Sequence, residues 1–341
     1  MSETYPEGHC PSFVIYRLPG HTEPILLTHE AAGQGTYTFC LAPFRETKDC
    51  PHLVFEANQL QRGAEALQSL STLMKENGPQ EAPLPEGTEA SSTYTACFAR
   101  FHEALQSGRF QKLVLSRPFP AQWTDAAGTF ERLCGRYPHS LVYLLHIPES
   151  GTWLGATPEL LLRHTPAGWD TMALAGTKTD SEAPWDAKNR EEQALVRRYL
   201  REQLRPHCQR VTEGETHTLH TGQLHHLCTR LQFEPWTGVE PKTLAQALHP
   251  TPAVCGLPKR EAISFITQHE GYPRTYYAGY LGPIGVDGET HLYANIRCAR
   301  LHADGRATAY AGSGLLASST LESEREEIRQ KSQALFHEDH V

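Results

Sequence analysis

Residues 310–336, YAGSGLLASSTLESEREEIRQKSQALF, predict a short strand, a glycine turn and a closing helix. Ser319 and Glu322 have the spacing of a capping box, so we expect the helix to begin at about Thr320. Apolar residues recur every seven positions and predict one core-facing stripe, formed by Leu321, Ile328 and Leu335.

The charged residues of this helix fall into two columns. At about 100° per residue, one column borders the apolar stripe and contains Glu324, Glu327 and Lys331. The other lies on the opposite side and contains Glu322, Glu326 and Arg329. Two carboxylates three positions apart repel each other unless a cation lies beside them. The bordering column therefore indicates either a metal or basic ligand, or a solvated face on which Lys331 pairs with Glu327.

Composition narrows the class of protein. The 341 residues are 39% hydrophobic, which is enough for a large core, and the length alone suggests two domains. The net charge of −8 argues against a nucleic-acid partner. Neither a signal peptide nor an 18-residue apolar stretch is visible, so we expect a cytoplasmic protein that is not bound to a membrane. Nine cysteines without a CxxC pair favour a reducing compartment over a disulfide framework or zinc site.

The first quarter of the chain has little functional signal. Short apolar runs separated by Pro and Gly predict a β-rich opening over residues 1–56. A helix is expected from about Asn58 to Lys75, followed by the linker-like stretch GPQEAPLPEGTEASS. Ser92 then suits the cap of a helix that runs to about Gln106.

The next segments predict strands with polar residues at informative places. In QKLVLSR, residues 111–117, one face carries Lys112, Val114 and Ser116. The runs SLVYLLHI, TWLGATPELLLRH and TMALAGTK are also strand-like, and helix is expected at about residues 126–136. Glu159 enters an apolar run, where it is either a turn residue or an acid with a raised pKa.

The segment WDAKNREEQALVRRYLREQL, residues 185–204, predicts a second informative helix. Its apolar arc consists of Leu195, Val196, Tyr199, Leu200 and Leu204. Glu192 lies near the middle of this arc, and burying an unpaired carboxylate costs several kcal/mol. Glu192 must therefore be neutral, paired or bound to a cation. The arginines of the helix point elsewhere, which favours a functional role.

Two hairpins and a loop complete the pattern. Residues 209–220 and 223–233 predict a hairpin around Thr221-Gly222. A structured loop from His249 to Pro258 leads into a helix at about residues 259–269. A second hairpin turns at Asp-Gly, and one of its faces is expected to carry Tyr293, Asn295, Arg297 and Ala299. Arg297 is either an edge residue or a carboxylate clamp.

Ten short motifs together resemble the chorismate-utilising enzymes, in the order that is typical of that family. They are KLVLSR, GATPELLLR, LAGT, KNREEQ, HLCT, LHPTPAVCGLP, YYAG, NIRCA, YAGSG and ESEREEIRQK, and the match covers about residues 92–336. The region resembles isochorismate synthases more than the sister activities. The resemblance implies one α+β fold, as in anthranilate synthase component I, with two packed antiparallel β-sheets flanked by helices. Residues 91–338 would form the catalytic domain, and residues 1–90 a β-rich portion that packs on it.

The resemblance also implies roles for individual residues. Lys112 would activate water as the general base, and Glu159 would protonate the departing hydroxyl of chorismate. To act as a base near pH 7, Lys112 has to lose the proton that an ordinary lysine keeps. Mg²⁺ would be held by Glu192 and Glu327, with Glu324 close by, where it would act through water or through its neighbours, and an all-carboxylate set suits this ion. Further substrate-binding positions would be Thr177, His249, Tyr277, Arg297, Gly312, Gly314 and Lys331.

Several departures and alternatives accompany the resemblance. Asn189 and Gln193 replace the usual acidic residue and histidine beside the metal glutamate, and Cys255 replaces a common glycine. Aminodeoxychorismate synthases carry a lysine at the position of Ala175, and anthranilate synthases lack the lysine found here as Lys112. A salicylate synthase, which also eliminates pyruvate, stays open, as does a non-catalytic chorismate-binding protein. We expect a monomer whose product feeds menaquinone, siderophore or salicylate synthesis, with menaquinone favoured.

Overall fold

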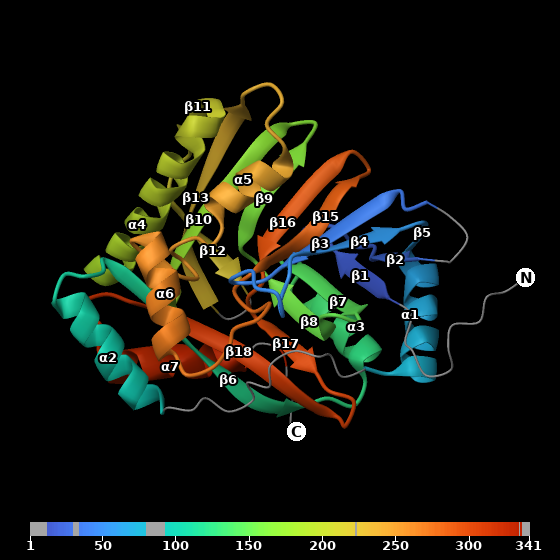
Figure 1. The fold of residues 1–341 in the computed structure, drawn as a ribbon, viewed down its shortest axis with the longest axis horizontal. Coiled ribbons are helices and arrows are strands. Elements are labelled where there is room, and N and C mark those ends of the chain that lie inside the picture. The colour runs from blue at the N-terminus through green and yellow to red at the C-terminus, as the bar shows by residue number, and fades with distance from the viewer. Residues whose placement is uncertain (1–11, 30–33, 80–92, 222–223, 334, 336–341) are drawn as a thin grey trace, which may run out of the picture.

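The computed structural model describes residues 12–29, 34–79, 93–221, 224–333 and 335, which form two large antiparallel β-sheets with helices around them (Figure 1). This arrangement confirms the predicted fold class. The expected boundary near residue 90, the cap at Ser92 and the turn residue Gly222 lie outside the described residues.

In the described residues, each sheet follows one continuous path of antiparallel neighbours. The first contains, in spatial order, β14 (Gly256–Leu257), β6 (Lys112–Gln122), β18 (Arg306–Leu315), β17 (Cys298–Leu301), β8 (Gly151–Thr157), β7 (Leu141–Ile147), β1 (Phe13–Arg17), β2 (Ile25–Thr28) and β5 (Gln59–Arg62). The second contains β11 (Cys208–Glu213), β13 (Leu224–Pro235), β10 (Gly168–Lys178), β9 (Leu160–Thr165), β16 (Glu289–Ala294), β15 (Tyr280–Val286), β3 (Tyr37–Ala42) and β4 (Leu53–Ala57), with β12 (His217–Thr221) beside β13.

The N-terminal strands extend both sheets. Strand β1 pairs with β7 in the first sheet, whereas β3 pairs with β15 in the second. Along β1 the side chains alternate: Val14 and Tyr16 join the cluster between the sheets, and Phe13 and Ile15 join the cluster under the outer helices. The described strands before residue 62 therefore share their hydrophobic core with the later strands.

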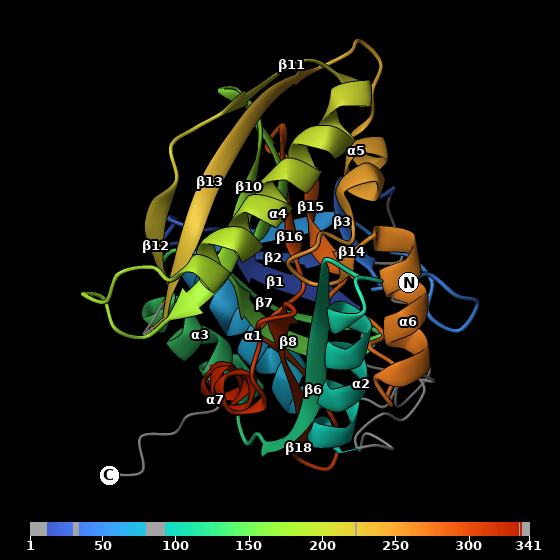
Figure 2. The same ribbon diagram turned by 90° about the vertical axis from the view of Figure 1, so that its left-hand side faces the viewer.

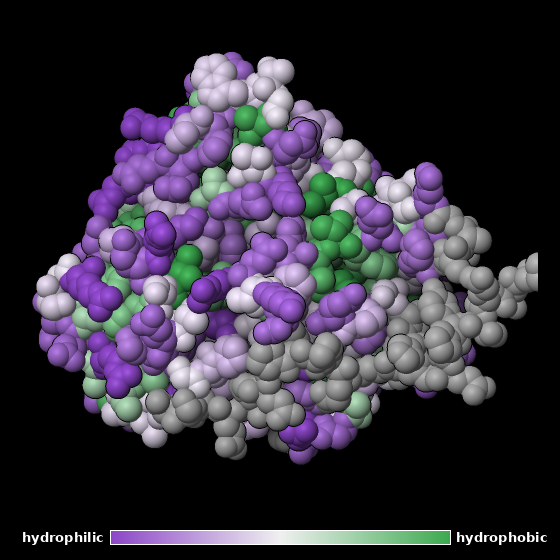
Figure 3. Space-filling model, in the orientation of Figure 1, coloured by the Kyte–Doolittle hydropathy of each residue, from purple (hydrophilic) through white to green (hydrophobic). Residues whose placement is uncertain are grey.

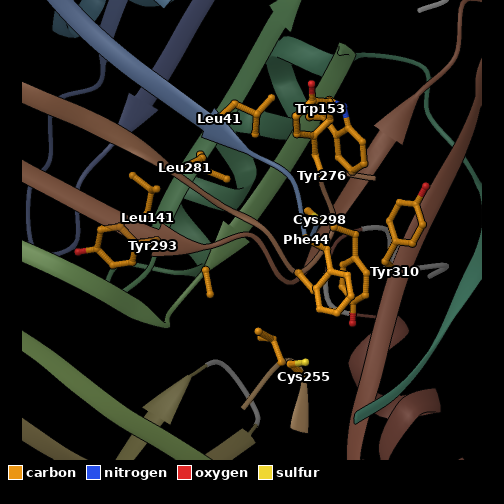
Figure 4. Close-up of a cluster of buried hydrophobic side chains, with 14 of the residues drawn as sticks. Leu41, Phe44, Leu141, Trp153, Cys255, Tyr276, Leu281, Tyr293, Cys298 and Tyr310 are labelled. Carbon is orange, nitrogen blue, oxygen red and sulfur yellow. The ribbon is translucent and has the colours of Figure 1, made fainter. Parts of the chain in front are cut away.

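The core between the sheets is rich in aromatic side chains (Figure 4). The Trp153 ring lies 5.8 Å from Tyr310 and 6.1 Å from Tyr276. Tyr310 also stacks on Tyr277, with the ring centroids 5.0 Å apart. Aromatic side chains bury large apolar areas. Their packing therefore holds in position the strand ends that line the cavity of the candidate site.

The helices cover three regions of the sheets (Figures 1 and 2). The outer face of the first sheet packs against α1 (Gly63–Asn77) and α3 (Ala126–Arg136). The outer face of the second packs against α4 (Ala187–Leu204) and α5 (Pro241–Leu248), and a 3₁₀ turn, η1 (Arg205–His207), follows α4. Near β6 and β18 lie α2 (Tyr94–Gln106), α6 (Lys259–His269) and α7 (Leu321–Ser332). The expected helices at residues 126–136 and 259–269 are confirmed.

Three expected elements have different boundaries. Residues 59–62 form strand β5 on the edge of the first sheet, so the helix predicted from Asn58 begins only at Gly63. The strand predicted over residues 209–220 is divided into β11 and β12, which both pair with the long β13. The run of residues 152–164 is divided at Pro158 into β8 and β9, which belong to different sheets, because proline cannot donate to the ladder.

The expected shared face of Tyr293, Asn295, Arg297 and Ala299 is wrong, because the chain crosses between the sheets at this point. Strand β16 ends at Ala294 in the second sheet and β17 begins at Cys298 in the first. Arg297 has a φ of 48°, in the left-handed region that side chains other than glycine adopt rarely. Asn295 fixes the crossing, since it accepts a hydrogen bond from Tyr143 Oη and donates one to the Tyr276 carbonyl.

Polar side chains dominate the described part of one face of the molecule (Figure 3). On the face shown in Figure 3, hydrophilic residues cover most of the surface, in keeping with a charged-residue content of 21%. Among the described helices, none is long and apolar enough to cross a membrane.

Candidate active site

A cavity lies between the two sheets and the helices α4 and α7. Its empty volume is about 670 Å³, a value that includes space open to solvent. Many of the residues that the sequence predicts for the site line it: Glu159, Thr177, Glu192, Tyr277, Arg297, Gly312, Gly314 and Lys331. Lys112, Glu324 and Glu327 are paired with other charged side chains around the cavity, whereas His249 is placed elsewhere.

Strand β6 places Lys112 next to Glu192 of α4, which lines the cavity. The Lys112 Nζ atom lies 2.8 Å from Glu192 Oε1, and the two side chains are 0% and 9% exposed. Gly314, on the neighbouring strand β18, leaves the room for this pair. A Cβ atom at residue 314 would lie 2.1 Å from Glu192 Oε1 and 2.9 Å from Lys112 Cε.

Glu192 is buried in its charged form. Burial by itself would raise the pKa of this carboxyl, but the nearby ammonium groups of Lys112 and Lys188 outweigh burial and hold the pKa below its ordinary value. Of the three states that the sequence allows for Glu192, the structure shows the paired one.

Glu159 follows Pro158 at the break between the two sheets, and its carboxyl is buried. Burial raises the pKa of Glu159 to about 7, although Lys112 and a hydrogen bond from Thr251 act in the opposite direction. The Thr251 Oγ1 atom donates to Glu159 Oε1 at 3.3 Å. A carboxyl with such a pKa can hold a proton near neutral pH and release it to a leaving group.

Arg297 points into the cavity and is held by His226 of β13. Its Nη2 atom donates to His226 Nε2 at 2.7 Å and to Thr221 Oγ1 at 2.9 Å. His226 Nε2 must therefore be the unprotonated nitrogen, and Nδ1 donates to the Gly176 carbonyl at 2.8 Å. Burial, followed by the charges of Arg297 and Lys331, lowers the pKa of His226 well below its ordinary value. Burial also lowers the pKa of Arg297 to about 10, so the guanidinium stays charged at neutral pH.

The two unusual residues beside Glu192 both anchor α4 to the second sheet. Asn189 Oδ1 accepts a hydrogen bond from the backbone nitrogen of Thr177 at 3.0 Å. Gln193 Nε2 donates to Thr229 Oγ1 at 2.7 Å. Uncharged amides at these positions hold the helix next to the cavity without adding charge to it.

Gly312, Ser313 and Gly314 are part of strand β18 and do not form the expected turn. Strand β17 pairs with β18 only as far as Ala309, and the residues beyond it line the cavity. The Lys331 Nζ atom donates to the Gly312 carbonyl at 3.1 Å. A Cβ atom at residue 312 would come within 2.8 Å of Tyr277 Oη, so glycine keeps this wall of the cavity open.

Helix α7 has the predicted orientation, although its cap is one residue later than expected. The Thr320 side chain caps the helix by accepting from the Ser323 backbone nitrogen, whereas the Ser319 hydroxyl accepts from Leu316. Glu324 is 0% exposed. The other column is exposed and contains Glu322, Glu326 and Arg329. The pair that the second interpretation predicts is present, with Lys331 Nζ 2.7 Å from Glu327 Oε1, but the Glu327 side chain is only 15% exposed, so this face is not fully solvated.

The carboxylates fit an open magnesium site but not a closed one. Within the part of the chain that the structure describes, no three His, Cys, Asp or Glu side chains form a ready-made metal cage. Glu324 Oε2 is nevertheless buried and has no hydrogen-bond partner among the described residues. Magnesium is commonly bound by one or two carboxylates together with water and substrate oxygens. Glu192 and Glu327, from two different helices, match this pattern, and neither Cys nor His competes for a softer metal.

One predicted site residue lies away from the cavity, and two residues that were not predicted lie at or near it. His249 ends α5 and lies close to Pro43, whose carbonyl is 3.0 Å from its Nε2 atom, and it does not line the cavity. The cavity histidine is His226, and Lys188 contacts Glu324. His226 belongs to the motif HLCT and Lys188 to the motif KNREEQ, but only the folded chain shows where these side chains point.

Comparison with known proteins agrees with this geometry. A family model described as "Chorismate binding enzyme" matches residues 26–338. A putative isochorismate synthase, MenF, of Mycobacterium tuberculosis is 34% identical over 284 residues, which cover 73% of this chain and 75% of that protein. The isochorismate synthase EntC of Escherichia coli is 32% identical over 262 residues, which cover 72% of this chain and 65% of EntC.

A solved structure shares the fold over almost the whole chain. The putative 2,3-dihydroxybenzoate-specific isochorismate synthase DhbC of Bacillus anthracis superposes with a TM-score of 0.77 at 23% identity, covering 96% of each chain. With the family model spanning nearly the whole chain and both sheets present, this protein is a member of the chorismate-binding enzyme family.

Proposed function

We propose that the protein is an isochorismate synthase, which adds water at C2 of chorismate as the hydroxyl at C4 leaves. The observation that carries the proposal is that a buried acid, Glu159, lines the cavity, and a buried lysine, Lys112, contacts Glu192 in the wall of the same cavity. The names of the relatives from M. tuberculosis and E. coli support the same activity.

The proposed reaction divides proton transfer between these two residues. Lys112 removes a proton from the attacking water, and a new bond forms between the water oxygen and C2. The two conjugated double bonds of the ring shift, from C1=C2 to C1=C6 and from C5=C6 to C4=C5, as the bond from C4 to its hydroxyl breaks, and Glu159 supplies the proton with which the hydroxyl leaves as water. Each turnover thus adds one water and releases one, with Lys112 gaining a proton and Glu159 losing one. The pKa of about 7 for Glu159 supports its role as the acid.

The two carboxylates of chorismate require positive charge or amide groups in the cavity. Arg297 and Lys331 supply the positive charge, and the backbone of Gly312 and Gly314 supplies close contact without a side chain. Thr177 and Tyr277 line the remaining wall and would hydrogen-bond to the hydroxyl and ring substituents. His226 would act through Arg297, by fixing the direction of its guanidinium.

Glu192 and Glu327 would hold Mg²⁺, with Glu324 beside it, and the ion would neutralise the ring carboxylate of chorismate as charge redistributes. Lys112 and Lys331 already neutralise these two glutamates in the protein alone. Occupation of the site therefore requires the lysines to exchange their carboxylate partners for water or substrate.

One residue in the cavity wall argues against an aminodeoxychorismate synthase. Ala175, at 7% exposure, forms part of its wall, where an aminodeoxychorismate synthase would need a lysine nucleophile. A salicylate synthase would have the same lysine and glutamates, so these residues do not distinguish it from the proposed activity and an experiment has to do so.

The test is to incubate the purified protein with chorismate and Mg²⁺ and to separate isochorismate, salicylate and anthranilate by chromatography. We expect isochorismate, no formation of salicylate above the rate in buffer, and loss of the product when EDTA replaces Mg²⁺. The Glu159→Gln variant serves as the inactive control. Salicylate as the enzymatic product would establish the alternative activity, and unchanged chorismate would support a non-catalytic binding protein.

We further propose that residues 91–338 carry the catalytic machinery and that residues 1–90 complete the sheets, in a cytoplasmic monomer. The product would feed menaquinone or siderophore synthesis.

A further inference from the structure

An ion pair that the proposed reaction does not need connects the two helices with the metal-binding carboxylates. Lys188, in the first turn of α4, lies 2.5 Å through its Nζ atom from Glu324 Oε1 of α7. The Lys188 side chain is 19% exposed and that of Glu324 is 0% exposed. A pair that is this well buried is a fixed part of the structure, unlike an exposed ion pair on a protein surface.

Three such pairs surround the cavity. Lys112 pairs with Glu192, Lys331 with Glu327, and Lys188 with Glu324, so three ammonium groups balance three carboxylates. Lys331 lines the cavity and Lys112 is proposed as its base, whereas Lys188 does not line it. Burial would lower the pKa of Lys188, but Glu324, Glu327 and Glu192 outweigh burial and raise it above its ordinary value. All three carboxylates of the cluster therefore act on this one ammonium group.

We propose that Lys188 is a tethered counter-cation of the α4–α7 carboxylate cluster: it holds Glu324 and α7 in place when no divalent cation is bound, and it weakens the binding of that cation. This inference rests on the proposed magnesium site. Lys188 is a positioning residue, because it acts through Glu324 and contacts no reacting atom.

The charges explain why such a residue is useful. Without Lys188 the three carboxylates would leave the cluster with surplus negative charge, which destabilises the helix pair and attracts any divalent cation. With Lys188 the cluster is neutral, so Mg²⁺ alone adds two positive charges to it, whereas Mg²⁺ together with the dianion chorismate adds none. Lys188 thus favours joint binding of metal and substrate over binding of the metal alone.

The test compares Lys188→Met, which keeps the length and apolar stem of the side chain, with Lys188→Arg, which keeps its charge. Mg²⁺ is titrated into each protein without chorismate, at constant ionic strength, by isothermal titration calorimetry. We expect Lys188→Met to bind Mg²⁺ at least about tenfold more tightly than the unmodified protein, as one like charge has been removed from the cluster. Lys188→Arg should keep the original affinity. Lys242→Met, which removes an exposed lysine of α5, is the control for net charge and should also change nothing.

Thermal unfolding provides the second readout. In EDTA, Lys188→Met should unfold at a lower temperature than the unmodified protein, and Mg²⁺ should raise its melting temperature by a larger amount. If Lys188→Met fails to fold, Lys188→Met in the Glu324→Gln background removes both charges of the pair, and its Mg²⁺ affinity should exceed that of Glu324→Gln alone.

An unchanged or weaker Mg²⁺ affinity on removing Lys188 would overturn the inference. The proposed function would survive that result if the unmodified protein still converts chorismate to isochorismate in the presence of Mg²⁺. Failure of that conversion, with tighter Mg²⁺ binding by Lys188→Met, would instead refute the function and support the counter-cation.

Discussion

The ammonium group of Lys112 lies 2.8 Å from the carboxylate of Glu192, and the two side chains are 0% and 9% exposed. This contact joins strand β6 of the first sheet to helix α4 on the second. Removing one partner of a buried ion pair costs about 3–5 kcal/mol, because the other charge is left unpaired. The proposed base and a proposed metal ligand therefore stabilise each other's position before any ligand binds.

Lys112→Ala is expected to abolish turnover while chorismate still binds in the presence of Mg²⁺. Loss of a general base lowers the rate by about 10²–10⁴-fold, and Arg297, Lys331 and the backbone of β18 stay in place to hold the substrate. The rate is measured by chromatography of the product, and binding by calorimetry. Lys259→Ala is the matched control, since this half-buried lysine contacts Tyr199 and Ala247 outside the cavity, and its turnover should persist. Near-normal turnover of Lys112→Ala would remove this residue from the mechanism.

The pKa of Glu159 predicts how activity depends on pH. Burial raises this pKa from 4.5 to about 7, so the protonated form that the proposed acid requires is lost as the pH rises through about 7. The value of kcat/KM should therefore fall above about pH 7, and Glu159→Gln should have very low activity at every pH.

The same shift predicts a change in stability. The folded protein binds a proton at Glu159 that the unfolded chain releases above about pH 4.5, so the stability from this group is present at low pH and is lost as the pH rises through about 7. The free energy of unfolding of the unmodified protein, measured in urea, should fall between pH 5 and 8 relative to that of Glu159→Gln. Parallel curves for the two proteins would show that Glu159 is already ionised at pH 5.

The sequence predicted the helices that face the cavity because their patterns are local. An apolar arc interrupted by Glu192 and a stripe bordered by Glu324 follow from the helical period alone, and both glutamates are buried, although for Glu324 the period also allowed a solvated face. The class of fold and the activity depended on ten motifs in one order. No single motif would have been specific enough.

The remaining features depend on contacts between distant residues. Strand β5 forms where a helix was expected because residues 59–62 pair with β2, more than 30 positions earlier in the chain. Arg297 leaves its predicted strand because the chain crosses between the sheets, which no period of two or 3.6 residues can indicate. Lys188 and Glu324 are likewise 136 positions apart, so their contact could be seen only in the folded protein.

Glu327→Gln is expected to weaken Mg²⁺ binding. A neutral amide oxygen is a poorer ligand for this hard cation than a carboxylate oxygen, and the change also removes one negative charge from the cluster. The measurement is a Mg²⁺ titration with chorismate present. Glu326→Gln is the matched control, because this adjacent glutamate is exposed and pairs with Arg329 on the other side of α7. If both variants give the titration of the unmodified protein, Glu327 is not a ligand.

Gly314→Ala tests whether the space beside the Lys112–Glu192 pair is needed. The added Cβ atom would lie 2.1 Å from Glu192 Oε1, closer than any side-chain atom can approach, so the pair has to move. We expect a loss of stability of roughly 1–3 kcal/mol, together with weaker Mg²⁺-dependent chorismate binding and lower turnover. Chemical unfolding and calorimetry measure these effects.

Gly135→Ala supplies the comparison for the Gly314 variant. This exposed glycine of α3 has no atom within 4 Å of the added Cβ, and alanine favours a helix over glycine by about 1 kcal/mol. Its turnover should be unchanged and its stability no lower. If Gly314→Ala behaved in the same way, Glu192 would have room to relax, and the close packing of β18 against the ion pair would not be what holds Glu192 in position.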